Sequence, residues 1–71
     1  MRYAIVIEKA ASNYAAYVPD LPGCVATGAT IQETETMIRQ AIEFHLEDLA
    51  ESGAAIPAPM SKSDYVEVLA S

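Results

Sequence analysis

The sequence lacks the residues that usually hold so small a protein together. Among 71 residues it has one cysteine, one histidine, no tryptophan and four Lys or Arg. A single cysteine excludes an intramolecular disulfide, and there is no cluster of Cys and His that could form a structural metal site. No catalytic constellation is visible either. We therefore expect a protein that is not an enzyme and that needs no metal ion or other cofactor.

Long apolar runs are also missing. The run after Arg2 covers five residues, which is too short for the core of a signal peptide. No stretch approaches the roughly 20 apolar residues that a membrane-spanning helix needs. We therefore expect a cytoplasmic protein that does not associate with membranes.

The length of the chain predicts a single domain over residues 1–71. A domain of this size buries only about 60% of the surface that its unfolded chain exposes, so its core is thin. With disulfides and structural metals excluded, self-association is the remaining common way to stabilise such a core. We expect a homodimer or a higher homo-oligomer.

The few basic residues face ten acidic ones, which gives a formal net charge of −6. Direct binding to nucleic acid is not expected, because contacts with phosphates need Lys and Arg. An acidic surface suits a basic protein partner and speeds the encounter with it. From charge alone, a surface that only keeps the protein in solution is the favoured interpretation.

A long helix is predicted over residues 31–51. Thr30 and Glu33 form a T-x-x-E capping box, in which each side chain accepts a hydrogen bond from a free backbone N–H at the helix start. Gly53 can take the left-handed conformation that ends a helix. One apolar stripe follows the spacing of three and four residues, and its members are Met37, Ile38, Ala41, Ile42, His45, Leu46 and Leu49.

Four strands are predicted around this helix, over residues 2–9, 14–18, 24–27 and 65–70. The first three are joined by short connections, which favours an antiparallel meander, and the fourth would pair at a sheet edge after the helix. The element order is therefore β-β-β-α-β. Strands and helix segregate into two layers, which is typical of the α+β class.

The segment Pro19–Gly23 between the second and third strands is a rigid turn, because its two prolines fix φ and remove two backbone donors. Leu21 at its centre either covers the core or forms an exposed contact. Cys24 beside the turn is interpreted as a small buried hydrophobic residue, since no basic residue close in sequence would lower its pKa. His45 is interpreted as a residue at the edge of the apolar stripe.

Carboxylates allow one catalytic alternative, because a meander followed by a helix also begins the RNase H-like fold. A metal-dependent nuclease needs several carboxylates converging on metal ions. The candidates would be Glu8, Asp20 and a helix carboxylate. The densest acidic patch consists of Glu43, Glu47, Asp48 and Glu51, and it is either a solvated helix face or a docking surface for a basic partner.

Three stretches together resemble the HicB antitoxin family: Y-V-P-D-L-P-G-C-V-A-T-G-A-T-I-Q-E, A-I-E-F-H-L-E and S-G-A-A-I-P-A-P. The resemblance runs from about Tyr3 to Pro59. It implies a degenerate RNase H-like domain without catalytic carboxylates. It also implies an antitoxin that binds and masks a small basic HicA-type toxin, a ribonuclease that cleaves mRNA.

The resemblance leads us to expect partner contacts from a small set of acidic residues: Asp20, Glu43, Glu47, Asp48 and Glu51. Many members of the family append a DNA-binding domain and repress their own operon. The present sequence ends at Ser71 without such a segment, so we do not expect this chain alone to repress transcription. The alternative is a stand-alone oligomeric HicB-like module that binds another ligand.

Overall fold

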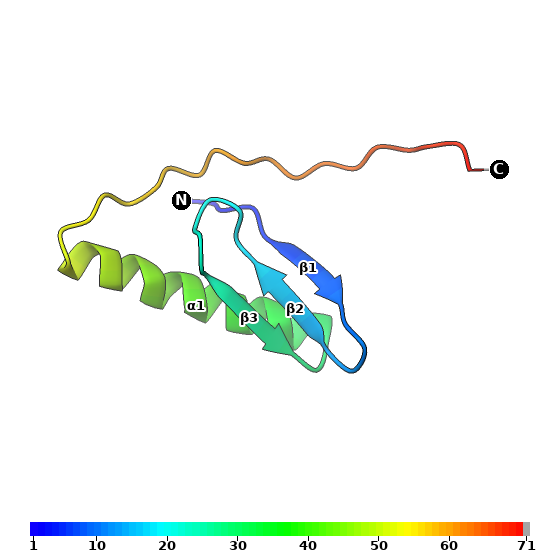
Figure 1. Ribbon diagram of the computed structural model, residues 1–71, viewed down its shortest axis with the longest axis horizontal. Helices are drawn as coiled ribbons and strands as arrows, with labels where there is room; N and C mark the ends of the chain where they lie inside the picture. Colours follow the sequence, from blue (N-terminus) through cyan, green and yellow to red (C-terminus); the bar gives the residue numbers. More distant parts are fainter. Residues whose placement is uncertain (71) are drawn as a thin grey trace.

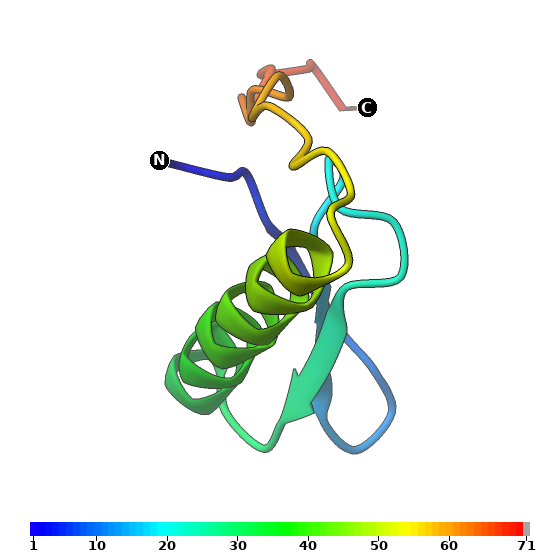
Figure 2. The same cartoon turned by 90° about the vertical axis from the view of Figure 1, so that its left-hand side faces the viewer.

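Three antiparallel strands and one helix form two layers in the computed structural model, which describes residues 1–70 (Figure 1). The strands are β1 (Val6–Lys9), β2 (Tyr14–Tyr17) and β3 (Val25–Gly28), and α1 (Ile31–Glu51) follows them. The helix packs on one face of the sheet (Figure 2). The predicted α+β class and antiparallel meander are confirmed.

The sheet has the order β1-β2-β3, so β1 and β3 are its two edges. In the register, Ile7 pairs with Ala16, and Ala16 pairs with Ala26. This row faces the helix, where Ala16 is buried. Small side chains in the centre of the sheet therefore let the helix approach closely.

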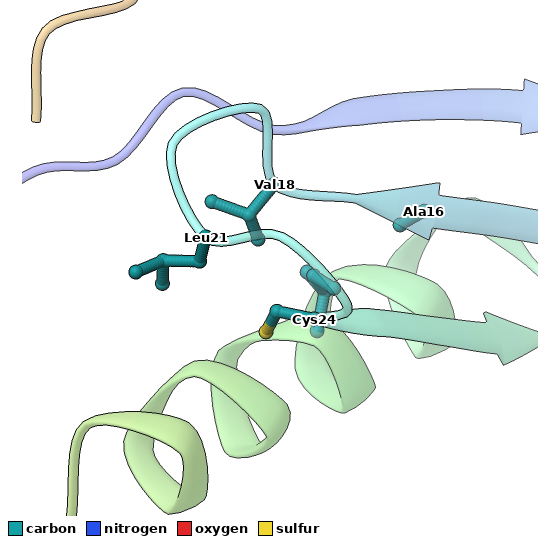
Figure 3. Packing of buried hydrophobic residues seen from close by; sticks show 5 residues of the cluster. Ala16, Val18, Leu21 and Cys24 are labelled. Atoms are coloured by element: carbon teal, nitrogen blue, oxygen red, sulfur yellow. The ribbon is translucent and has the colours of Figure 1, made fainter. Parts of the chain in front are cut away.

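The turn after β2 closes the end of the core. The backbone N–H of Leu21 donates to the carbonyl of Val18 at 3.1 Å, and the N–H of Cys24 donates to the carbonyl of Leu21 at 3.0 Å. Leu21 is fully buried, so it covers the core and is not an exposed contact. Figure 3 shows Val18, Leu21 and Cys24 gathered where the loop meets the helix.

The helix begins at the predicted cap. The N–H of Glu33 donates to Thr30 Oγ1 at 3.0 Å, and Glu33 Oε1 accepts from the N–H of Ala29 at 3.3 Å. The capping box is confirmed, although its second bond reaches one residue further back than the standard pattern. At the other end Gly53 has φ +73°, the left-handed conformation that ends the helix.

The helix stripe is largely as predicted, with one correction. Ile38 is buried, and the other five members between Ala41 and Leu49 are half-buried. Met37 is 42% exposed, and the buried position one turn earlier belongs to Thr34. The Thr34 hydroxyl donates to the carbonyl of Thr30 at 2.7 Å, so its burial leaves no unpaired polar atom. Gly28 lies directly against Thr34 and leaves no room for a larger side chain there.

The predicted fourth strand is wrong. Within residues 54–70 the structure has no strand, and Tyr65–Leu69 are exposed and extend beyond the end of the sheet (Figure 1). Strand propensity shows only that a segment suits a pleated surface, and it does not supply a backbone partner. The first strand also starts later than predicted, at Val6, and the third strand is Val25–Gly28 instead of residues 24–27.

Candidate partner-binding site

The acidic patch predicted from the sequence lies on one exposed face of α1. A spacing of four residues brings Glu43, Glu47 and Glu51 onto the same side, and Asp48 lies next to Glu47 on the exposed surface. All four side chains are exposed. The structure therefore brings together four of the five residues predicted to bind a partner.

An exposed aromatic side chain lies among these carboxylates, and the sequence analysis missed it. Phe44 is 72% exposed, three residues before Glu47 and four before Asp48. In the sequence, Phe44 can be recognised only as an apolar residue that lies outside the predicted apolar stripe of the helix. We call the group Glu43, Phe44, Glu47, Asp48 and Glu51 the acidic helix face.

Two surface hollows flank Phe44. The first runs along the helix between Gln40 and Ala50, with Phe44, Glu43 and Glu47 among its lining residues. The second lies between the helix and the edge strand β3, and it is lined by Gly23, Cys24, Val25, Ala41, Phe44, His45 and Asp48. Val25 is 64% exposed there. Phe44 thus joins the acidic helix face to the edge of the sheet.

The carboxyl end of α1 is an electrostatically unfavourable place for the acidic side chains that it carries. The carboxyl end of a helix carries a partial negative charge, which favours Lys and Arg and disfavours Asp and Glu. The last turn of α1 contains no basic residue, and Glu47, Asp48 and Glu51 lie at that end. A cationic surface bound here would relieve this repulsion.

Asp20, the fifth predicted contact residue, lies apart from the acidic helix face and binds the C-terminal segment. Its Oδ2 accepts from the N–H groups of Met60 at 2.9 Å and Ser61 at 2.8 Å, and its Oδ1 accepts from the Ser61 hydroxyl at 2.8 Å. The hydrogen bonds from Ser61 lower the pKa of the Asp20 carboxyl from its ordinary value. Asp20 therefore anchors the chain that follows the helix.

A second anchor holds the same segment. The Tyr3 hydroxyl donates to the carbonyl of Pro57, 54 residues later in the chain. Residues 61–63 lie close to residues 2–5, with a surface hollow between them. Together the two anchors place the segment along the N-terminal residues that precede β1.

The other candidate residues are not assembled into a reactive site. Cys24 is buried, and this burial raises the pKa of its thiol, as expected for a structural cysteine. His45 is half-buried at the edge of the stripe, as predicted. Within residues 1–70 no three His, Cys, Asp or Glu side chains come together as a group that could hold a metal ion.

Comparison with known proteins agrees with this arrangement. Residues 3–69 match the family model described as the HicB-like antitoxin of bacterial toxin–antitoxin systems. The chain belongs to the HicB-like antitoxin family. In the part of the chain that the structure describes, no helix combines the length and the apolar character needed to cross a membrane.

Several relatives share the sequence. An uncharacterised 14.9 kDa protein of Haemophilus phage HP1 is 36% identical over 66 residues, which cover 93% of this chain and 50% of that protein. A UPF0150 protein of Helicobacter pylori is 48% identical over 62% of this chain and 61% of its own length. Another, from Thermoplasma acidophilum, is 36% identical over 80% of this chain and 84% of its own length. The chain thus spans about half to five-sixths of these relatives.

A solved structure shares the fold. A chain from a HicA3 and HicB3 toxin–antitoxin complex superimposes with a TM-score of 0.74 and 30% sequence identity. The match covers 84% of this chain and 70% of that one. The HicB-like fold and the antitoxin family are therefore supported by both sequence and structure.

Proposed function

We propose that this protein is an antitoxin that binds a small basic HicA-type ribonuclease and masks the surface with which that toxin cleaves mRNA. The acidic helix face would make the contact. The observation that carries the proposal is the exposed Phe44 set among four carboxylates at a helix end that holds no basic residue in its last turn. Family membership and the shared fold of the HicA3 and HicB3 complex support it.

Charge and apolar area would have different parts in this contact. The net charge of −6 attracts a basic protein at long range and raises the rate of encounter. A basic surface placed at the carboxyl end of α1 would also compensate the helix dipole. Phe44 can bury a large apolar area, and aromatic residues dominate the affinity of many interfaces. The carboxylates would therefore direct the toxin, and Phe44 would hold it.

The proposed action is non-catalytic and needs no cofactor. In this proposal the domain is a degenerate RNase H-like fold. Asp20 was a candidate nuclease carboxylate, but its side chain anchors residues 60 and 61. Since the proposed target cleaves mRNA, the action would take place in the cytoplasm. Direct contact with nucleic acid is not part of the proposal, because only four Lys and Arg are present.

Self-association is a further part of the proposal. Within residues 1–70 only five apolar side chains are buried, which is a thin core for a chain of this length. Half-buried apolar residues surround this core on the β1 side, and they include Tyr3, Ile5 and Ile42. A second copy could cover them.

Recovery of the tagged protein from its own cells, with mass spectrometry of the bound proteins, tests the proposal. The expected result is one small basic protein in stoichiometric amount, whose ribonuclease activity is lost in the complex and returns when the two are separated. Recovery of the homo-oligomer alone would contradict the antitoxin function. It would favour a stand-alone module that binds another ligand.

A pair of charge reversals then locates the contact. Glu47→Lys lies on the acidic helix face, and Glu8→Lys changes the net charge equally at the exposed end of β1. We expect Glu47→Lys to weaken toxin binding at least about tenfold, equivalent to about 1.4 kcal/mol. The Glu8→Lys control should change the affinity much less. Equal losses would mean that overall charge, and not this surface, determines binding.

A further inference from the structure

The inner side of β1 is only partly covered, because Val6 and Ile7 are half-buried and Ile7 packs against the core. The helix packs over β3 and β2 and makes few contacts with β1. Because β1 is also an edge strand, its outer backbone groups have no partner strand in the described part of the chain, residues 1–70. The two-layer core is therefore incomplete on this side.

A partly apolar groove lies on this side, and its lining includes four charged residues: Arg2, Glu35, Arg39 and Glu43. Its volume is about 440 Å³, and its lining includes Tyr3 and Ile5 from the segment before β1. The helix contributes Ile38, Ile42 and Leu46. Tyr3, Ile5, Ile42 and Leu46 are half-buried residues that pack against the core, so the groove is a continuation of the core that opens to solvent.

The same chain carries an exposed segment with the pattern of a strand. Tyr65, Val66, Val68 and Leu69 are 97%, 83%, 77% and 103% exposed. Alternation in a strand would place Val66 and Val68 on one face and Glu67 on the other. β-Branched and aromatic residues of this kind fit a pleated and half-buried surface. The segment therefore carries exposed apolar side chains of the kind that could fill the groove.

The two anchors determine where this segment goes. Tyr3 holds Pro57, and Asp20 holds Met60 and Ser61, so the chain is fixed in place four residues before Tyr65. Beyond them the segment continues past the end of the sheet (Figure 1), and none of residues 65–69 lines the groove of its own chain. Its high exposure shows that its own domain does not cover it.

We propose that residues 65–69 of one copy add to the β1 edge of a second copy and place Val66 and Val68 in its groove. The exchange is reciprocal, so a two-fold dimer fills both grooves with the same contact. Each added strand also pairs the free backbone groups of β1, as in other cases of strand addition. In this dimer the segment that the sequence pattern predicts as a fourth strand pairs with the sheet of the other chain.

Cross-linking distinguishes this exchange from pairing within one chain. The double variant Ile5→Cys and Val66→Cys, in a Cys24→Ala background, places one thiol in the groove and one on the segment. After treatment with a short bis-maleimide, exchange gives a covalent dimer on denaturing gels. A monomer closed by an internal cross-link, or no cross-link, would overturn the proposal. This test uses no toxin, so its result is independent of the proposed antitoxin function.

Oligomeric state gives a second test in the protein without added cysteines. Light scattering at about 100 μM, well above the micromolar range of many such contacts, should show a dimer. Val66→Glu with Val68→Glu should give a monomer with an unchanged far-ultraviolet spectrum, because both residues are exposed in the separate chain. Glu67→Gln is the matched control and should remain dimeric. A wild-type monomer, or a dimer that survives the double substitution, would overturn the proposal.

Discussion

Asp20 and Ser61, 41 residues apart in the sequence, are joined by two hydrogen bonds. One carboxylate oxygen accepts from the Ser61 N–H and the other accepts from its hydroxyl, each at 2.8 Å. An ionised carboxylate carries no proton, so both of its oxygens can accept hydrogen bonds. The P-D-L-P-G turn therefore has two functions: Leu21 covers the core, and Asp20 holds the chain after the helix.

Asp20→Asn should release the anchored segment without unfolding the domain. The amide has one acceptor oxygen and no charge, so it cannot accept all three bonds from Met60 and Ser61. We expect the backbone amides of these two residues to lose protection from hydrogen exchange, with little change in the Tm. The measurement is exchange followed by NMR.

Asp64→Asn is the matched control for this substitution. Asp64 Oδ1 accepts only from the N–H of the next residue, Tyr65, so it connects no distant parts of the chain. Its replacement should leave the exchange of Met60 and Ser61 unchanged. If Asp20→Asn also leaves their exchange unchanged, the anchor does not form in solution.

The same anchor should depend on pH in a defined direction. The pKa of Asp20 is lowered in the folded protein from an ordinary value of 3.8. The contribution of the carboxylate is therefore fully present above pH 3.8, and it is lost as the pH falls through the lowered folded value. The amide chemical shifts of Met60 and Ser61 should titrate with a midpoint below 3.8. A midpoint at or above 3.8, or the same titration in Asp20→Asn, would contradict this assignment.

Gly28→Ala should destabilise the domain through a steric clash. An added Cβ would lie 2.6 Å from Thr34 Oγ1 and 2.7 Å from the Thr34 backbone nitrogen, and the backbone cannot move aside easily. Overpacking of this kind costs about 1–3 kcal/mol. For a domain of this size the Tm should fall by roughly 4–8 °C per kcal/mol.

Gly53→Ala separates this clash from the conformational effect of replacing a glycine. Gly53 has φ +73° and open space around it, so its replacement meets only the cost of the left-handed conformation, about 1–2 kcal/mol.

A side chain without the hydroxyl at position 34 should restore stability to Gly28→Ala but not to Gly53→Ala, because only Gly28 lies against Thr34. Thr34→Ser in the Gly28→Ala background leaves the clashing oxygen and nitrogen in place and should not restore stability. Thr34→Ala removes the oxygen and should restore part of the lost stability.

The local elements could be predicted because each has a complete local signal. The capping box at Thr30 and Glu33, the stop at Gly53 and the apolar stripe all depend on residues within a few positions of one another. The paired prolines likewise predicted the turn around Leu21. Such signals fixed the helix bounds, which the structure gives as Ile31–Glu51.

Long-range contacts could not be predicted in this way. Nothing near Asp20 in the sequence indicates that its partners are Met60 and Ser61. Residues 65–70 have a strand pattern, but they have no strand partner among the residues that the structure describes. Phe44 was missed for a different reason. It lies in the middle of the helix and outside the apolar stripe, so neither the charge pattern nor the helical periodicity indicates it.

Phe44→Ala tests whether this aromatic residue holds the toxin. Because the side chain is 72% exposed, its removal should change the free energy of unfolding by no more than about 0.5 kcal/mol. Truncation of a central aromatic contact costs about 2 kcal/mol or more in binding, a loss of about 30-fold. The measurement is calorimetric titration with the small basic protein recovered from cells, alongside thermal unfolding. Ile31→Ala is the control, since Ile31 is 44% exposed at the opposite end of the same helix. If Phe44→Ala binds as tightly as the wild type, or if both variants lose affinity equally, the toxin does not bind at the acidic helix face.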